Sequence, residues 1–163
     1  MEVLMFEEVL LPTDGSKGVT RAYDCAVNLA QKCGSRVHVL FVAETVYPGP
    51  WFSYDVSDKA QEKILEAGKK IVETAREELQ RHGATRVECV VKEGHPAETI
   101  LSYAKEVGID LIVMGTRGRR GIERALMGSV TREVVNLSEV PVLVVRATPI
   151  DRKESQRPSS LTE

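Results

Sequence analysis

The chain has 163 residues, of which 22 are basic and 24 acidic, and its formal net charge is −2. This length fits one domain with a hydrophobic core, and so small a net charge excludes the global positive field that draws a protein to nucleic acid or to an anionic membrane. No apolar run approaches the length that spans a bilayer, and the N-terminus lacks the basic start and cleavage site of a signal peptide. We therefore expect a cytoplasmic protein with neither a nucleic-acid nor a membrane partner.

Five apolar segments of strand length alternate with segments of helical periodicity. The expected strands are Val9–Leu11, Val37–Ala43, Arg86–Lys92, Leu111–Met114 and Val142–Val145. The third alternates apolar and polar residues, as a strand at the edge of a sheet does. Because helices between successive strands imply parallel pairing through right-handed crossovers, the pattern predicts a layered α/β sandwich.

Four helices are expected between these strands. Gly68 interrupts the second of them, and glycine is unfavourable inside a helix, so it predicts close packing at that point. Pro96 marks the start of the third helix, where proline is well tolerated. In chain order the helices end at Gly34, run from about Ser57 to His82, run from Pro96 to about Gly108, and run from Ser129 to about Leu137.

The chain offers no pattern for a disulfide or a metal site. Its three cysteines lack CxxC spacing, and two of them fall on the expected buried face of the first helix, so we expect reduced core thiols. Its three histidines fall in three different elements, and we assign them structural roles. We therefore expect no metal held by protein ligands alone. These residues are Cys25, Cys33, Cys89, His38, His82 and His95.

The most informative segment runs from Gly115 to Val135 and is rich in glycine and arginine. It leaves the strand Leu111–Met114 through a loop and enters a helix at Gly128-Ser129. A glycine loop that leads into a helix start lets backbone N–H groups approach an anion, and the helix N-terminus adds partial positive charge. The spacing matches neither the P-loop nor the dinucleotide-binding fingerprint. The segment is typical of a phosphate-binding loop of another kind, although turn geometry and solvated arginines are the more common explanation when the segment is taken alone.

The glycines also fit a family pattern. Gly115, Gly118, Gly128 and Ser129 fill the motif G-x2-G-x9-G-(S/T). Together with three further segments on a matching βα skeleton, they make the chain resemble the universal stress protein family, specifically its ATP-binding branch, from about residue 5 to 146. The three segments are Pro12–Ser16, Gly94–Ala97 and Val140–Val145.

The resemblance implies a three-layer α/β/α sandwich of the adenine nucleotide alpha hydrolase-like, Rossmann-like kind, with a five-stranded parallel sheet in the order 3-2-1-4-5. Strands 1 and 4 would then be neighbours whose connections leave in opposite directions, and the crevice at their carboxyl ends is the expected ligand site. The resemblance also implies a homodimer through the last strand, Val142 to Val145, whose apolar residues suit a covered edge. We expect one domain, residues 1–146, and a polar tail, residues 147–163, that is disordered or docked on a partner.

Carried over position by position, the resemblance implies an ATP site, with Mg²⁺ or Mn²⁺ carried by the phosphates. A carboxylate repels phosphate, so Asp14 belongs at the nucleoside end. The nucleoside would contact Pro12, Thr13 and Asp14, with the adenine recognised by the backbone of Val42. The residues expected at the ribose and the phosphates are Met114, Gly115, Arg117, Gly118, Gly128, Ser129 and Val130.

Several of these residues also have purely structural explanations. Asp14 and Ser16 could cap the first helix, and Ser129 is a natural N-cap with or without phosphate. Val42 is by composition a core residue, and the Arg117 side chain could equally be solvated.

These observations favour a nucleotide-binding regulatory protein in a stress response, whose ATP occupancy is read by an unknown protein partner. A slow ATPase or phosphotransferase is the alternative, and it needs charge stabilisation, an oriented nucleophile and usually a metal. No lysine follows the glycines and no second carboxylate is evident near Asp14, so we assign no catalytic residue. A dimeric scaffold without nucleotide is the third alternative, and the complete glycine motif disfavours it.

Overall fold

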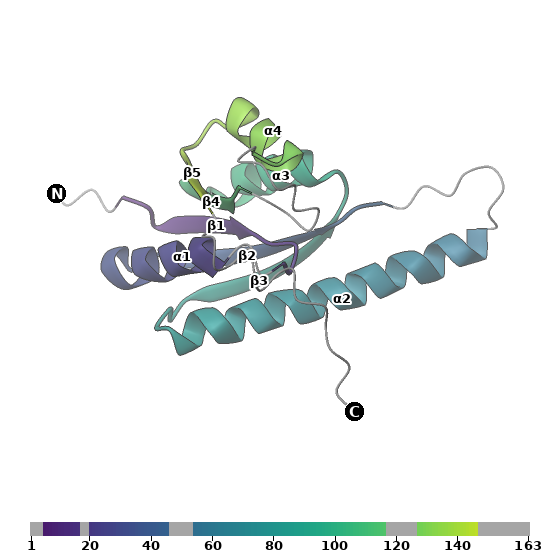
Figure 1. The fold of residues 1–163 in the computed structure, drawn as a ribbon, viewed down its shortest axis with the longest axis horizontal. Coiled ribbons are helices and arrows are strands. Elements are labelled where there is room, and N and C mark those ends of the chain that lie inside the picture. Colours follow the sequence, from purple (N-terminus) through teal and green to yellow (C-terminus); the bar gives the residue numbers. More distant parts are fainter. Residues whose placement is uncertain (1–4, 17–19, 46–53, 117–126, 147–163) are drawn as a thin grey trace.

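The computed structural model describes residues 5–16, 20–45, 54–116 and 127–146. Within them, five parallel strands form one sheet in the order β3-β2-β1-β4-β5, which confirms the predicted topology (Figure 1). The strands differ from the expected ranges by one residue at some ends. They are β1 (Glu8–Pro12), β2 (Arg36–Ala43), β3 (Val87–Glu93), β4 (Leu111–Gly115) and β5 (Val142–Val145).

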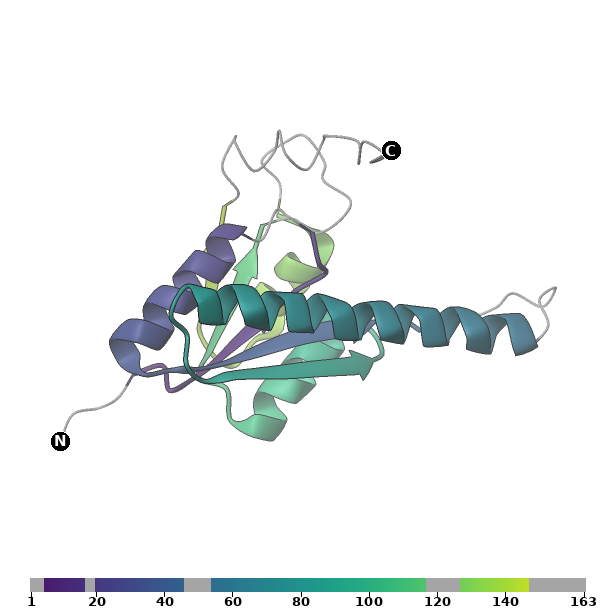
Figure 2. The ribbon, with the colours of Figure 1, turned by 90° about the horizontal axis from the view of Figure 1, so that it is seen from below.

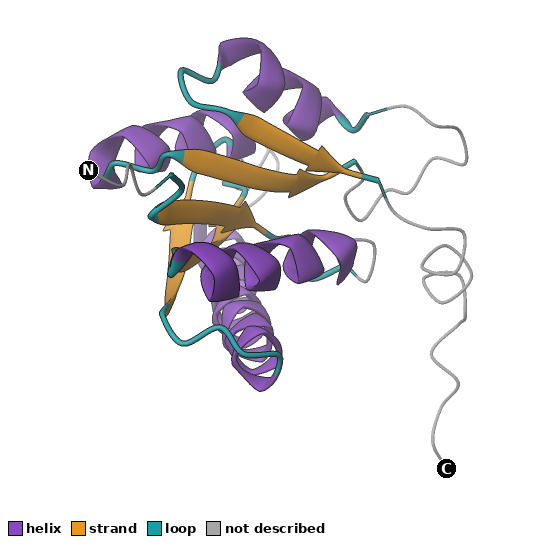
Figure 3. Ribbon diagram, turned by 90° about the vertical axis from the view of Figure 1, so that its left-hand side faces the viewer, coloured by secondary structure: helices purple, strands orange, loops and turns teal. Residues whose placement is uncertain are grey.

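Helices cover both faces of the sheet and make three layers, as Figure 3 shows. On one face, α1 (Thr20–Cys33) and α2 (Tyr54–Arg81) pack against alternate strand residues such as Val9 and Val39. On the other face, α3 (Pro96–Val107) and α4 (Ser129–Leu137) pack against the intervening residues, such as Leu10. Because helices cover both faces of the sheet, the inner strands are buried on both sides and are mostly apolar, with His38 of β2 as a buried polar exception.

The helix ends follow their sequence signals, except that α2 begins at Tyr54 and not near Ser57, and that the N-cap of α4 differs from the expected one. Pro96 occupies the first turn of α3, and Gly108 closes that helix in the left-handed conformation with a φ of 71°, both as predicted. The N-cap of α4 is Gly128, with Ser129 as the first helical residue, so the prediction of Ser129 as N-cap is wrong. Ser129 is exposed.

The buried face of α1 combines three alanines with Tyr23 and Val27, and the cysteines lie beside it. Ala22, Ala26 and Ala30 are buried against the sheet. Cys25 and Cys33 are half-buried, and Cys25 packs against the core at the border of this face. All three cysteines are free thiols.

Helix α2 is longer than the sheet that it covers and extends past the ends of the strands (Figure 2). Its packing against the sheet confirms the close approach predicted at Gly68, where a Cβ atom would lie 2.4 Å from the Phe41 ring. Further along α2, Val72, Ala75 and Leu79 are buried. Among the helices that the structure describes, none is long and apolar enough to cross a membrane.

Candidate functional site

The carboxyl ends of β1 and β4 lie side by side, as the topology requires. The two strands pair in parallel, with Leu10 opposite Ile112, so Pro12 and Met114, two residues further along each strand, reach the same edge of the sheet. The chain continues from β1 toward α1 on one face and from β4 toward α4 on the other (Figure 1). Such a switch point leaves room for a ligand between the two outgoing connections.

The start of α4 is held against the end of β4 by two hydrogen bonds. The Gly128 N–H donates to the Thr116 carbonyl at 2.8 Å, and the buried Thr131 hydroxyl donates to the Gly115 carbonyl at 3.0 Å. The first N–H groups of a helix have no partner within the helix, so Ser129 and Val130 present donors at this edge. Thr131 was missed by the sequence analysis, although its place in the first turn after Gly-Ser was a usable signal.

Among the described residues, a side chain at Gly128 would make one close contact at its Cβ atom, and that contact is of ordinary length. The Gly128 φ of −59° suits any residue, and a Cβ atom there would meet only the Thr116 carbonyl oxygen, at 3.4 Å. Gly15 differs, because its φ of 78° favours glycine and its Cβ would lie 2.8 Å from Ile71 Cδ1. Backbone conformation therefore explains Gly15 but does not explain Gly128.

The turn after β1 is held by side-chain hydrogen bonds. The Thr13 hydroxyl lies 2.9 Å from the Tyr23 hydroxyl of α1 and also accepts the Gly15 N–H at 3.2 Å. The Asp14 carboxylate accepts the Ser16 N–H at 2.9 Å, in the turn after β1. Residues 17–19, between this turn and α1, lie outside the described residues, so capping of the first helix by Asp14 and Ser16 stays a prediction. Burial raises the pKa of Tyr23, which keeps its phenol protonated at neutral pH.

The expected site residues are brought together wherever the structure describes them. Val42 lies on β2, two residues beyond Leu40, which pairs with Pro12, so Val42 also reaches the carboxyl edge. Arg117 and Gly118 lie outside the described residues, as do Arg119, Arg120, Arg124 and the tail 147–163. Within the described ranges, no group of three or more His, Cys, Asp or Glu side chains could hold a metal ion.

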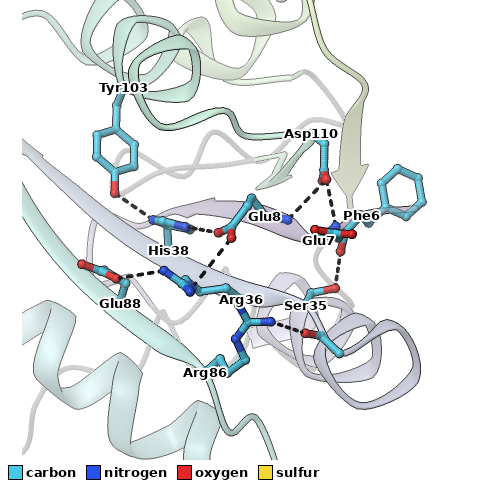
Figure 4. Close-up of polar contacts among 11 residues, drawn as sticks. Phe6, Glu7, Glu8, Ser35, Arg36, His38, Arg86, Glu88, Tyr103 and Asp110 are labelled. Carbon is cyan, nitrogen blue, oxygen red and sulfur yellow. Dashed lines mark hydrogen bonds and ion pairs between the residues drawn. The ribbon is translucent and has the colours of Figure 1, made fainter. Parts of the chain in front are cut away.

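A second polar cluster lies at the opposite, amino-terminal edge of the sheet (Figure 4). His38 of β2 is buried, with Nδ1 2.8 Å from the Tyr103 hydroxyl and Nε2 2.7 Å from a carboxylate oxygen of Glu8. A ring proton on Nε2 satisfies both contacts. Asp110 accepts the N–H groups of Glu7 and Glu8 at the start of β1.

The environment of this second cluster keeps its phenol neutral. Burial raises the pKa of Tyr103 to about 12, with further contributions from the carboxylates of Glu88, Glu106 and Glu8. The Glu8–His38–Tyr103 chain of hydrogen bonds joins β1, β2 and α3. Its His38 and Tyr103 members are buried, so we assign the chain a structural role.

An open parallel sheet with its switch point between β1 and β4, and with a helix start fixed at the carboxyl edge, defines a doubly wound α/β protein with a Rossmann-like fold. More particularly, the chain belongs to the universal stress protein family, which matches it over residues 5–146.

Individual relatives agree with this assignment. Universal stress protein YxiE of Bacillus subtilis is 35% identical over 153 residues, covering 87% of this chain and 100% of the relative. The structure of universal stress protein UspA from Lactobacillus plantarum is similar, with a TM-score of 0.79, 28% identity, and coverage of 87% of this chain and 99% of the other. A universal stress protein solved in complex with cAMP has a TM-score of 0.65 and 26% identity, and the match covers 88% of this chain and 99% of the other.

Proposed function

We propose that this protein binds ATP in the crevice at the carboxyl ends of β1 and β4, and that its occupancy regulates a partner protein in a cytoplasmic stress response. The observation that carries the proposal is Gly128. Its backbone conformation is ordinary, and among the described residues its Cβ position meets only the Thr116 carbonyl oxygen, at 3.4 Å, yet a glycine begins this helix, which is fixed to the sheet edge. A missing side chain at such a point leaves the helix N–H groups accessible to a phosphate.

The nucleoside end of the ligand is placed at the turn after β1. There the Asp14 carboxylate can accept a hydrogen bond from a ribose hydroxyl or from the adenine amino group, whereas it would repel a phosphate. Pro12, Thr13 and the backbone of Val42 complete this end. The ribose and inner phosphates are placed at Met114, Gly115, Arg117 and Gly118, and the outer phosphates at Gly128, Ser129 and Val130. Mg²⁺ or Mn²⁺ would arrive with the phosphates.

A related structure supports an adenine nucleotide as the ligand class. The universal stress protein in complex with cAMP shares the fold at 26% identity and covers 88% of this chain. cAMP combines an adenine, a ribose and a phosphate, so a site of this kind in a relative agrees with a nucleoside end and a phosphate end here.

Binding is favoured over catalysis by the groups at the phosphate end. Transfer of a phosphoryl group needs charge stabilisation together with an oriented nucleophile. The segment from Gly115 to Val135 contains no lysine and a pair of acids, Glu123 and Glu133, and the helix start offers backbone N–H groups, which hold a phosphate without activating water. A slow ATPase remains the alternative function.

The proposed function is tested by mass spectrometry of small molecules released on denaturing the freshly purified protein, repeated after incubation with ATP and Mg²⁺. We expect intact ATP in both samples. ADP or AMP with turnover during the incubation would instead favour the ATPase. Absence of any bound adenine nucleotide, before and after incubation, would overturn the proposal and favour a nucleotide-free scaffold.

We further propose a homodimer through β5. This strand lies at the edge of the sheet, and its Leu143 side chain is 41% exposed. An exposed apolar edge strand invites pairing with another chain, which supports the dimer.

Leu143→Lys is expected to convert the dimer to a monomer, because a lysine on an edge strand opposes pairing. Light scattering during gel filtration measures the mass. Val107→Lys, at an exposed valine on α3, is the control and should stay dimeric; a monomeric wild type, or a dimeric Leu143→Lys variant, would contradict the prediction.

A further inference from the structure

We propose that Tyr23 is a positioning residue of the nucleotide site: its hydroxyl holds Thr13 and, through Thr13, the turn that carries Asp14. This inference rests on the proposed function, because it assigns a role toward the same ligand. Tyr23 lies on α1, outside every segment that the family motifs contribute, and no contact of its own with a nucleotide is required.

The contact between Tyr23 and Thr13 is short and buried. The two hydroxyl oxygens are 2.9 Å apart, and the side chains are 8% and 7% exposed respectively. Thr13 is also held through its backbone, because its N–H donates to the Leu40 carbonyl of β2 at 2.9 Å. The Thr13 side chain is therefore fixed from the sheet on one side and from α1 on the other.

The fixed position of Thr13 also restrains the next two residues, Asp14 and Gly15. The Thr13 hydroxyl oxygen accepts the Gly15 N–H at 3.2 Å, so Asp14 lies between two residues that are tied to each other. On its other side, Gly15 packs so closely against Ile71 of α2 that no Cβ atom would fit. The turn is thereby confined between α1 and α2, and the direction of the Asp14 side chain follows from the turn.

The positioning role belongs to the hydroxyl of Tyr23 and not to its ring. The ring packs in the core between the sheet and α1, and a phenylalanine would fill the same volume. The carboxylate of Asp14 is among the groups that raise the pKa of Tyr23, after burial and Glu78, so the two side chains are close enough to interact electrostatically. Because the phenol stays protonated, its hydrogen bond persists through the neutral pH range.

The test is Tyr23→Phe, with Kd measured by calorimetry for ATP and for AMP. Loss of one buried hydrogen bond should weaken both ligands by the same factor, roughly three- to tenfold, since both contain the nucleoside. Ser129→Ala provides the reciprocal case, because it removes a donor at the outer phosphates and should weaken ATP without weakening AMP. The matched control is Tyr103→Phe, which removes another buried tyrosine hydroxyl, that bonded to His38, and should leave both Kd values unchanged.

A double-mutant cycle separates positioning from a general structural effect. Thr13→Val removes the same hydrogen bond from the other partner, so if Tyr23 acts through Thr13, Tyr23→Phe should have no further effect on Kd in the Thr13→Val background. Equal Kd values for Tyr23→Phe and wild type would overturn the inference and leave the proposed function standing. Additive effects of the two substitutions, or a loss for ATP but not for AMP, would also overturn it. If the wild type bound neither nucleotide, the proposed function itself would fail.

Discussion

Gly128→Val is expected to weaken ATP binding by roughly a hundredfold or more while the protein stays folded. The valine side chain would occupy the space in front of the first N–H groups of α4. Each charge-assisted hydrogen bond to a phosphate contributes about 1.5–3 kcal/mol, so losing those of Ser129 and Val130 accounts for an effect of this size. Within the described residues, a Cβ atom at this position meets only the Thr116 carbonyl, at an ordinary contact distance, and a φ of −59° with a ψ of 157° suits valine.

The measurement combines calorimetric titration with ATP and thermal unfolding of both proteins. We expect the free energy of unfolding to change by about 1 kcal/mol or less, because glycine is only a moderately good N-cap. Asn136→Val, at an exposed position near the other end of α4, introduces the same side chain and should leave the Kd unchanged. If Gly128→Val bound ATP as the wild type does, the phosphate end of the site would be wrongly placed.

His38→Ala is expected to lower the free energy of unfolding by about 2–4 kcal/mol, the largest stability effect predicted here. The substitution leaves a cavity between β2 and α3. It also removes the partner of the buried Tyr103 hydroxyl, at 2.8 Å, and one partner of the Glu8 carboxylate, at 2.7 Å, which keeps its contact with Arg36 (Figure 4). A buried polar group that loses its partner costs more than the hydrogen bond itself contributes.

Urea unfolding of the variants measures this effect. His82→Ala is the matched control, because His82 is exposed and its ring contacts a carbonyl of the preceding helix; its stability should change by less than about 0.5 kcal/mol. Tyr103→Phe should destabilise the wild type but have a smaller effect in the His38→Ala background, since the same contact is already lost. A His38→Ala variant as stable as His82→Ala would show that the cluster contributes nothing to the fold.

The order of the strands could be predicted without any tertiary contact. Alternating strands and helices limit the topology through the right-handed crossover, and the resemblance supplied the order 3-2-1-4-5 that the sheet has. The end of α3 at Gly108 was equally predictable from the sequence, because a left-handed residue that closes a helix is a local property of the chain. Such features depend on the backbone preferences of a few neighbouring residues.

Helix α4 begins at Ser129 as expected, but its N-cap shows where local reasoning was insufficient. Serine is the better N-cap by preference, yet Gly128 occupies that position and Ser129 is the first helical residue. The hydrogen bonds from Gly128 and Thr131 to the end of β4 set this start. These contacts depend on how the helix meets the sheet, which a local preference does not contain.

The sequence by itself determined the elements, their class of fold and the glycines that mark the candidate site. Only the tertiary structure decided which side chains support that site: Tyr23 for Thr13, and Thr131 for Gly115. It alone paired His38 with Tyr103, 65 residues away. Patterns of polarity and backbone preference repeat along the chain and can be read locally. A hydrogen bond between side chains of different elements requires both to arrive within about 3 Å, and that distance is set by the packing of whole helices on the sheet.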